Sequence, residues 1–310
     1  MTDETPPRAA RRTVLLLAIV AVAAAARLWN LRAGVPFAVG IDEPQVVDRA
    51  LRILKTGDWN THLFDYPTLA IYLHAIAAAA RFLWGAVRGE WTSLAGFRIR
   101  AVYTTARLLT AAIGVATVWL TYRIGARLGR RDVGLLAAAQ MAVQPSHVRE
   151  SHFALTDVPA AALTTAAVLL AVRAADRRTV RAYAAAGALS GLAAATKYIG
   201  GIALSALAVV WIVHERRAAD RWPKALAAAG AAAAAFLAGA PYTVLDLPGF
   251  LDGFARQFAR FAAVPPAPPG VVYLKHLSLV MWWWPPLAVA GALIALWRSR
   301  RRGDWAAVVV

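Results

Sequence analysis

The chain has 310 residues, of which 60% are hydrophobic and only 16% are charged, and its mean hydropathy is +0.52. Soluble domains carry about 25% charged residues, so the composition excludes an ordinary soluble protein and predicts an all-α, polytopic membrane protein. The net charge of +17 comes from short basic clusters between apolar runs, a pattern typical of cytoplasmic loops and not of nucleic-acid binding. Cysteine is absent, which excludes disulfides and thiolate metal sites and leaves carboxylate and imidazole as the ligands for any metal.

Eight apolar segments have about the length needed to cross a bilayer. In chain order they are Thr13–Leu31, Ala101–Tyr122, Val133–His147, Thr156–Val172, Ala182–Tyr198, Ile199–Val213, Ala225–Tyr242 and Leu277–Trp297. A further apolar stretch, Tyr66–Val87, contains His74 and Arg81. We therefore expect about eight transmembrane helices in a single membrane domain that covers residues 1–310.

Five basic clusters decide how these segments are oriented. They are Arg8/Arg11/Arg12, Arg123/Arg127/Arg130/Arg131, Arg173/Arg177/Arg178/Arg181, Arg216/Arg217/Arg221/Lys224 and Arg298/Arg300/Arg301/Arg302. All five fall on one side of the membrane only if Tyr66–Val87 does not cross it. The positive-inside rule therefore predicts that this stretch is an interfacial or re-entrant helix, that the N-terminus is cytoplasmic, and that the loop 32–100 faces outward. The first apolar run also resembles a secretory signal, and the loop after it faces outward on that interpretation too.

Two adjacent carboxylates, Asp42 and Glu43, stand in this outer loop. Ionisable groups at a membrane boundary are costly and often mark function. Pro44 begins an expected amphipathic helix with apolar residues at helical spacing, and the helix dipole would favour both charges. Capping of this helix explains one acidic residue but not two, so we interpret the pair as a functional site.

Asp157 is a second acidic candidate, at the outer start of a predicted span. Because Pro159 follows it, Asp157 could also serve as an N-cap, and the two roles are compatible. His147 and His152 lie in the preceding segment, but two histidines five residues apart do not share a helix face and are a weak metal motif. The candidate metal ligands are therefore Asp42, Glu43 and His152.

Several cations also fall on the outer side, against the positive-inside trend. Lys197 stands in an apolar sequence at the outer end of its predicted helix, where it either snorkels to the headgroups or binds an anion. Arg107 and Arg149 are close to the same side. Cations next to carboxylates suit a substrate in which a phosphate is attached to a lipid.

The last outer loop has three recognisable parts. Gly249–Ala262 is expected to form a surface helix, Pro265–Gly270 a stiff connector, and Trp282–Trp284 an interfacial aromatic belt. The sequence contains no internal repeat, no Walker loop and no dinucleotide fingerprint.

Taken together, these motifs resemble the membrane-embedded C-type glycosyltransferases, in the branch of the protein O-mannosyltransferases and the lipid A aminoarabinose transferases. The residues that carry the resemblance are Asp42-Glu43 in the first outer loop, Asp65-Tyr66-Pro67-Thr68-Leu69 at the start of a second helix, Arg107, the stretch Pro145–Asp157, and Thr196-Lys197-Tyr198. The resemblance covers most of the chain, but such enzymes usually continue through further spans. The sequence to Val310 is therefore expected to be the N-terminal membrane module of a longer or truncated enzyme.

The resemblance implies an inverting transferase of the plasma membrane that takes a sugar from a polyprenyl-phosphate donor and works on the extracytoplasmic face. Its acceptor would be a protein, a lipid or a glycan. Asp42 matches the catalytic carboxylate of the family, with Glu43 assisting or binding a metal, and Asp157 matches the acidic residue of the second outer loop. Lys197, Arg149 and Arg107 would bind the donor phosphate. A sugar-lipid transporter or flippase and a non-catalytic membrane scaffold are the alternatives from other classes.

Overall fold

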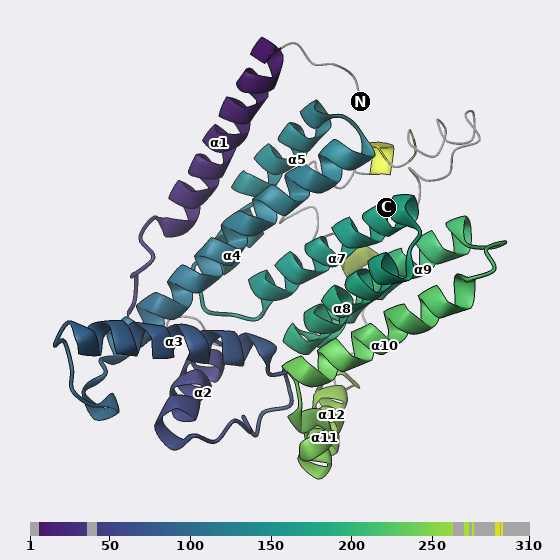
Figure 1. Ribbon diagram of the computed structural model, residues 1–310. Helices are drawn as coiled ribbons and strands as arrows, with labels where there is room; N and C mark the ends of the chain where they lie inside the picture. Colours follow the sequence, from purple (N-terminus) through teal and green to yellow (C-terminus); the bar gives the residue numbers. More distant parts are fainter. Residues whose placement is uncertain are drawn as a thin grey trace.

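The structure is a computed structural model that describes residues 6–35 and 42–262, with a few isolated positions after them. The described part of the chain is helical and contains no strand (Figure 1). The long helices in chain order are α1 (Pro6–Leu28), α2 (Glu43–Thr56), α3 (Leu69–Val87), α4 (Ile99–Leu128), α5 (Arg131–Val143), α7 (Asp157–Arg177), α8 (Val180–Thr196), α9 (Ala203–His214), α10 (Arg221–Gly239) and α12 (Leu247–Ala262). Shorter helical turns are η1 (Leu94–Gly96), α6 (Pro145–Glu150), η2 (Tyr198–Ile202) and α11 (Tyr242–Leu245).

Four helices of the described chain are long and apolar enough to cross a membrane: Ala9–Leu28 within α1, and α3, α4 and α7. The chain is therefore a polytopic, all-α membrane protein, as its composition predicts. The helices coincide with the predicted segments, except that Val133–His147 is divided into α5 and α6 and Ile199–Val213 into η2 and α9. Pro145 explains the first break, because proline disfavours the helical conformation of the residue before it, and Gln144 has a ψ of 114°. The predicted span Leu277–Trp297, its tryptophan run and the prolines before it lie outside the described residues.

Helices α8 and α10 pack against each other through glycines. Gly187 and Gly191 are four residues apart and face α10, where a Cβ at either position would lie 2.2 or 2.1 Å from the carbonyl oxygen of Ala228 or Ala232. Small residues at this spacing let two helix backbones approach closely, as in membrane GxxxG motifs. The contact fixes the end of α10 beside the end of α8, next to Lys197.

Helix α3 lies across one end of the bundle (Figure 1). At its start, the hydroxyl of Thr68 donates to the carbonyl oxygen of Gly239 at the end of α10, 2.8 Å away. Further along, Ala78 packs in a cluster with Val102 and Tyr103, near the start of α4. Helix α2 buries its apolar face against α3, and together they form a cap over the ends of α4 and α10. That Tyr66–Val87 is an interfacial helix stays a prediction, because α3 is also long and apolar enough to cross a membrane.

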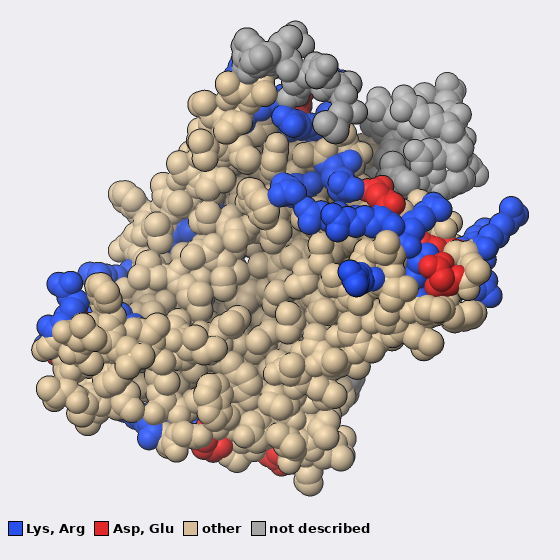
Figure 2. Space-filling model, viewed as in Figure 1, with Lys and Arg blue, Asp and Glu red and all other residues tan. Residues whose placement is uncertain are grey.

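The basic clusters meet at the opposite end of the bundle (Figure 2). Arg12 on α1 forms an ion pair of 2.8 Å with Asp132 on α5, and Arg127 on α4 pairs with Asp176 on α7. Arg178, after α7, contacts the Nδ1 atom of His214 on α9 at 3.1 Å. These contacts join four of the five predicted clusters, and the fifth lies outside the described residues. The end with the arginines is therefore distinct from the end with α2, α3 and the acidic candidates.

Candidate active site

The two adjacent carboxylates at the start of α2 have opposite environments. Asp42 precedes the helix and is exposed, whereas Glu43, in the first turn, is completely buried. Neither side chain caps the helix through a hydrogen bond. The expected capping of this helix by one of the two acidic residues is therefore not present in the structure, and the two residues must be considered separately.

Glu43 is held by Arg107 of α4. The guanidinium donates from Nε to Oε1 and from Nη2 to Oε2, both at 2.7 Å, and the side chain of Arg107 is 2% exposed. Arg107 Nη1 also donates to the carbonyl oxygens of Leu31 and Ala33, and Glu43 Oε1 accepts from the backbone N–H of Ala154 at 3.0 Å. This buried bidentate pair joins α2, α4, the segment after α1 and the segment before α7.

Asp42 is paired with a tyrosine. The hydroxyl of Tyr66 donates to Asp42 Oδ2 at 3.3 Å. Burial raises the pKa of the Tyr66 phenol, and the charge and hydrogen bond of Asp42 and the charges of Asp157 and Asp65 raise it further. The phenol therefore stays protonated and remains a hydrogen-bond donor at neutral pH.

Asp157 and Lys197 are paired between the start of α7 and the end of α8. Asp157 stands in the first turn of α7, after Thr156 at the N-cap position, and Lys197 follows the last turn of α8. Their side chains form an ion pair of 2.6 Å, with 47% and 32% of the side chains exposed. Because α7 and α8 are consecutive antiparallel helices, residues 40 apart in sequence lie side by side. The hydrogen bond from Tyr198 to the Phe64 carbonyl oxygen brings the Asp157–Lys197 pair near the segment with Tyr66, which we did not predict as a site residue although Asp65-Tyr66-Pro67 belongs to the motif.

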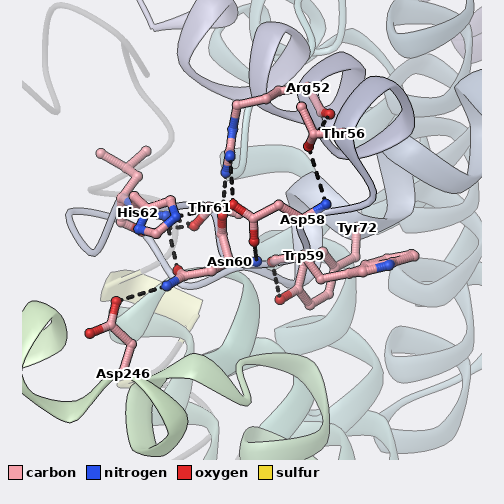
Figure 3. Close-up of polar contacts among 10 residues, drawn as sticks. Arg52, Thr56, Asp58, Trp59, Asn60, Thr61, His62, Tyr72 and Asp246 are labelled. Atoms are coloured by element: carbon pink, nitrogen blue, oxygen red, sulfur yellow. Dashed lines mark hydrogen bonds and ion pairs between the residues drawn. The ribbon is translucent and has the colours of Figure 1, made fainter.

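The loop between α2 and α3, which leads to Tyr66, is held by polar contacts of Arg52, Asp58 and Asn60 (Figure 3). Asp58 accepts hydrogen bonds from Arg52 at 2.8 Å, from the backbone N–H of Asn60 at 2.9 Å and from His62 at 3.1 Å. The pKa of the Asp58 carboxyl falls to about 2, mainly because of the hydrogen bond from Arg52 and also because of those from Asn60 and His62. The Asn60 amide donates to Asp246 Oδ2 at 2.8 Å and so connects the loop to the start of α12.

Helix α12 covers the other side of this loop. Arg260 forms a 2.7 Å ion pair with Asp65, the residue before Tyr66. The hydroxyl of Tyr198 donates to the Phe64 carbonyl oxygen at 3.0 Å, and its ring lies 5.6 Å from that of Phe254. The predicted surface helix of the last outer loop is therefore present as α12, and its aromatic face contacts residues on both sides of the candidate site.

The remaining candidates lie apart from this cluster. The Arg149 side chain is 74% exposed and pairs with Glu150. Together with Arg107 and His152, Arg149 lines a cavity of about 610 Å³ beside the segment that follows α1. His152 contacts the carbonyl oxygens of Val148 and Trp29, and both oxygens of Glu43 are engaged by Arg107. Within residues 6–35 and 42–262, no three His, Asp or Glu side chains are grouped as a metal site, so Asp42, Glu43 and His152 are not brought together.

A family profile described as Dolichyl-phosphate-mannose-protein mannosyltransferase matches residues 85–241, just over half of the chain. The chain belongs to this family. The matched region of this family member includes Arg107, Asp157 and Lys197, whereas Asp42 and Tyr66 precede it. A comparison with curated protein sequences gives no match.

Solved structures show the fold of this mannosyltransferase family member. The S. cerevisiae protein O-mannosyltransferase Pmt1-Pmt2 complex bound to the sugar donor is 19% identical to this chain, with a TM-score of 0.57. The match covers 77% of this chain and 34% of the yeast chain. The Archaeoglobus fulgidus oligosaccharyltransferase in complex with Zn and sulfate is 16% identical to this chain, with a TM-score of 0.61. The match covers 95% of this chain and 44% of the archaeal chain. The fold is that of the membrane-embedded C-type glycosyltransferases, as the sequence motifs suggest. The chain spans less than half the length of these structures.

Proposed function

We propose that this chain carries the catalytic site of a glycosyltransferase that moves a sugar from a polyprenyl-phosphate donor to an extracytoplasmic protein, lipid or glycan acceptor. The observation that carries the proposal is the contact of an exposed carboxylate, Asp42, with Tyr66, near the Asp157–Lys197 ion pair. It lies at the end of the bundle away from the arginine clusters. By the positive-inside rule that end faces outward across the plasma membrane, with the N-terminus in the cytoplasm.

The chemistry of the proposed transfer needs two groups. Asp42 would accept the proton of an acceptor hydroxyl as the new bond forms to the anomeric carbon from the face opposite the phosphate, so that the configuration inverts. The bond from that carbon to the phosphate oxygen breaks, and the polyprenyl phosphate leaves with the electron pair. Lys197 would stabilise the departing charge. Asp157 would orient the Lys197 ammonium.

Glu43 and Arg107 have a different part in this proposal. The carboxylate of Glu43 and the guanidinium of Arg107 are buried and engaged with each other, so neither is placed to exchange a proton with an acceptor. We assign them as positioning residues that fix Asp42 at the start of α2. The candidate divalent metal has no three-residue site among the described residues, and the proposed mechanism includes no step through one.

The test is a transfer assay with purified 310-residue chain, radiolabelled polyprenyl-phosphate mannose and an acceptor peptide. Asp42→Asn should lower the transfer rate by a factor of about 10² to 10⁴, the usual contribution of a general base, without loss of donor binding. Asp252→Asn, which removes an exposed carboxylate of α12 paired with Arg256, is the matched control and should keep wild-type transfer. Wild-type transfer by Asp42→Asn would refute the role of Asp42. Translocation without transfer would identify a flippase instead. The absence of both activities would indicate a non-catalytic scaffold.

A further inference from the structure

A pocket between α7 and α8 opens at the basic end of the bundle, on the opposite side of the molecule from Asp42. Its volume is about 370 Å³. The walls combine three arginines, a threonine and apolar side chains: Arg173, Arg177, Arg181, Thr179, Leu170 and Ala182. Neither the proposed transfer reaction nor its substrates account for this pocket.

The pocket concentrates positive charge that the surrounding residues do not neutralise. Arg173 is partly buried, and the charges of Arg123, Arg127 and Arg177 all act on it unfavourably. The neighbouring acid, Asp176, is already paired with Arg127. Across residues 6–35 and 42–262, the three pocket arginines make no ion pair with a carboxylate. The repulsion among these guanidinium groups would be relieved by an anion in the pocket.

The start of α8 adds a second anion-binding element. Thr179 is the N-cap, and its hydroxyl oxygen accepts from the N–H of Ala182 at 3.2 Å. Thr179 and Arg181, at the start of this 17-residue helix, line the pocket, and the positive end of the helix dipole favours a negative charge there. The negative end of α7 explains a basic residue at Arg177, in its last turn, but not the arginines at 173 and 181.

We propose that this pocket binds the phosphodiester headgroup of an anionic glycerophospholipid. The arginines and the start of α8 would hold the phosphate, and Leu170 and Ala182 would contact the glycerol backbone and the first acyl carbons. Basic pockets between membrane helices are suited to such headgroups. The lipid would neutralise the arginines and hold the α7–α8 hairpin, whose other end carries Asp157 and Lys197.

The binding is tested with purified 310-residue chain in detergent micelles that contain phosphatidylcholine, by native mass spectrometry and by the melting temperature. Phosphatidylglycerol, further phosphatidylcholine or inorganic phosphate is titrated into separate samples. The pocket variant is R173Q/R177Q/R181Q. The matched control is R130Q/R216Q/R217Q, which removes three exposed arginines from the same end of the bundle but outside the pocket. A third variant, R173K/R177K/R181K, keeps the charge but lacks the guanidinium fork.

We expect phosphatidylglycerol to bind and to raise the melting temperature of the wild type and of the R130Q/R216Q/R217Q control, while phosphatidylcholine has no effect. The pocket variant should bind phosphatidylglycerol at least about tenfold more weakly, because the loss of one charge-assisted hydrogen bond to a phosphate corresponds to about that factor. The lysine variant should fall between the two. The melting temperature in phosphatidylcholine alone shows whether each variant is folded, and single-arginine variants replace any triple variant that is not. An equal loss in the pocket and control variants would overturn the proposal in favour of non-specific attraction, and an equal effect of inorganic phosphate would show a free-phosphate site.

Discussion

At the scale of single residues, the contrast between Asp42 and Glu43 is the main result. The two carboxylates are adjacent in sequence, but Glu43 is fully buried against Arg107 while Asp42 is exposed beside Tyr66. A buried ion pair is costly to break because the partner that remains is an uncompensated charge. Glu43 therefore contributes to stability and position, and Asp42 is the residue that we propose as the general base.

A double-mutant cycle separates these roles. Glu43→Gln or Arg107→Met alone should lower the free energy of unfolding by about 3–5 kcal/mol, because each leaves its partner buried and unpaired. The double variant should lose clearly less than the sum of the two single losses. Melting temperatures in detergent give the free energies. Additive losses would show that the pair does not act as a unit.

The loop that carries Tyr66 should show an acid-dependent stability. The pKa of Asp58 falls from 3.8 to about 2 in the folded chain through its hydrogen bonds with Arg52, Asn60 and His62. The unfolded chain therefore takes up the proton at higher pH, so the contribution of Asp58 to stability is complete above pH 3.8 and is lost as the pH falls towards 2. The melting-temperature difference between wild type and Asp58→Asn should be constant above this window and vanish below it. A difference that persists at pH 2 would contradict this account.

At the scale of helices, small residues decide where the polar side chains meet. Gly187 and Gly191 bring α8 against α10, and this contact places the end of α10 beside the end of α8, where Lys197 pairs with Asp157 of α7. Sequence periodicity predicted the helices themselves because hydropathy is a local property of the chain. It did not predict which helix faces pack closely, because that depends on the fit of two surfaces.

This contact can be tested by adding a single methyl group. Gly191→Ala places its Cβ 2.1 Å from the Ala232 carbonyl oxygen, so α8 and α10 must separate, and we expect a loss of about 1–3 kcal/mol in stability. Gly230→Ala is the matched control in α10, since its Cβ meets nothing within 4 Å, and should be neutral or stabilising by about 0.5–1 kcal/mol. Thermal unfolding of both variants measures the difference. Equal melting temperatures would argue against close packing at Gly191.

At the scale of the whole molecule, the two ends of the bundle differ in charge and content. Four arginine clusters meet at one end, and the carboxylates, Lys197 and the cap of α2, α3 and α12 lie at the other (Figure 1, Figure 2). The positive-inside rule predicts that the end with the arginine clusters faces the cytoplasm. Helix α3 is the critical element, because its length and composition would allow it to cross, whereas its contacts place it across the bundle end.

The orientation is testable with single cysteines, since the chain has none of its own. Lys55→Cys precedes α3, Ser93→Cys follows it, and Arg217→Cys lies at the basic end; all three positions are exposed. If α3 lies in the membrane surface, a membrane-impermeant maleimide should label Cys at both 55 and 93 in intact cells. It should label the cysteine at position 217 only after permeabilisation. Opposite labelling at 55 and 93 would show that α3 crosses the membrane.

Hydropathy and charge along the chain were enough to predict a helical membrane protein, the positions of most of its helices, and basic clusters apart from Asp42 and Asp157. These properties follow from the composition of each segment and do not depend on the residues packed against it. The burial of Glu43, the exposure of Asp42 and the contact of Tyr66 with Asp42 were not evident from the sequence, because they arise from tertiary packing. The partners of Glu43 are 64 and 111 residues away, at Arg107 and Ala154, so its burial and charge balance depend on the packing of distant segments.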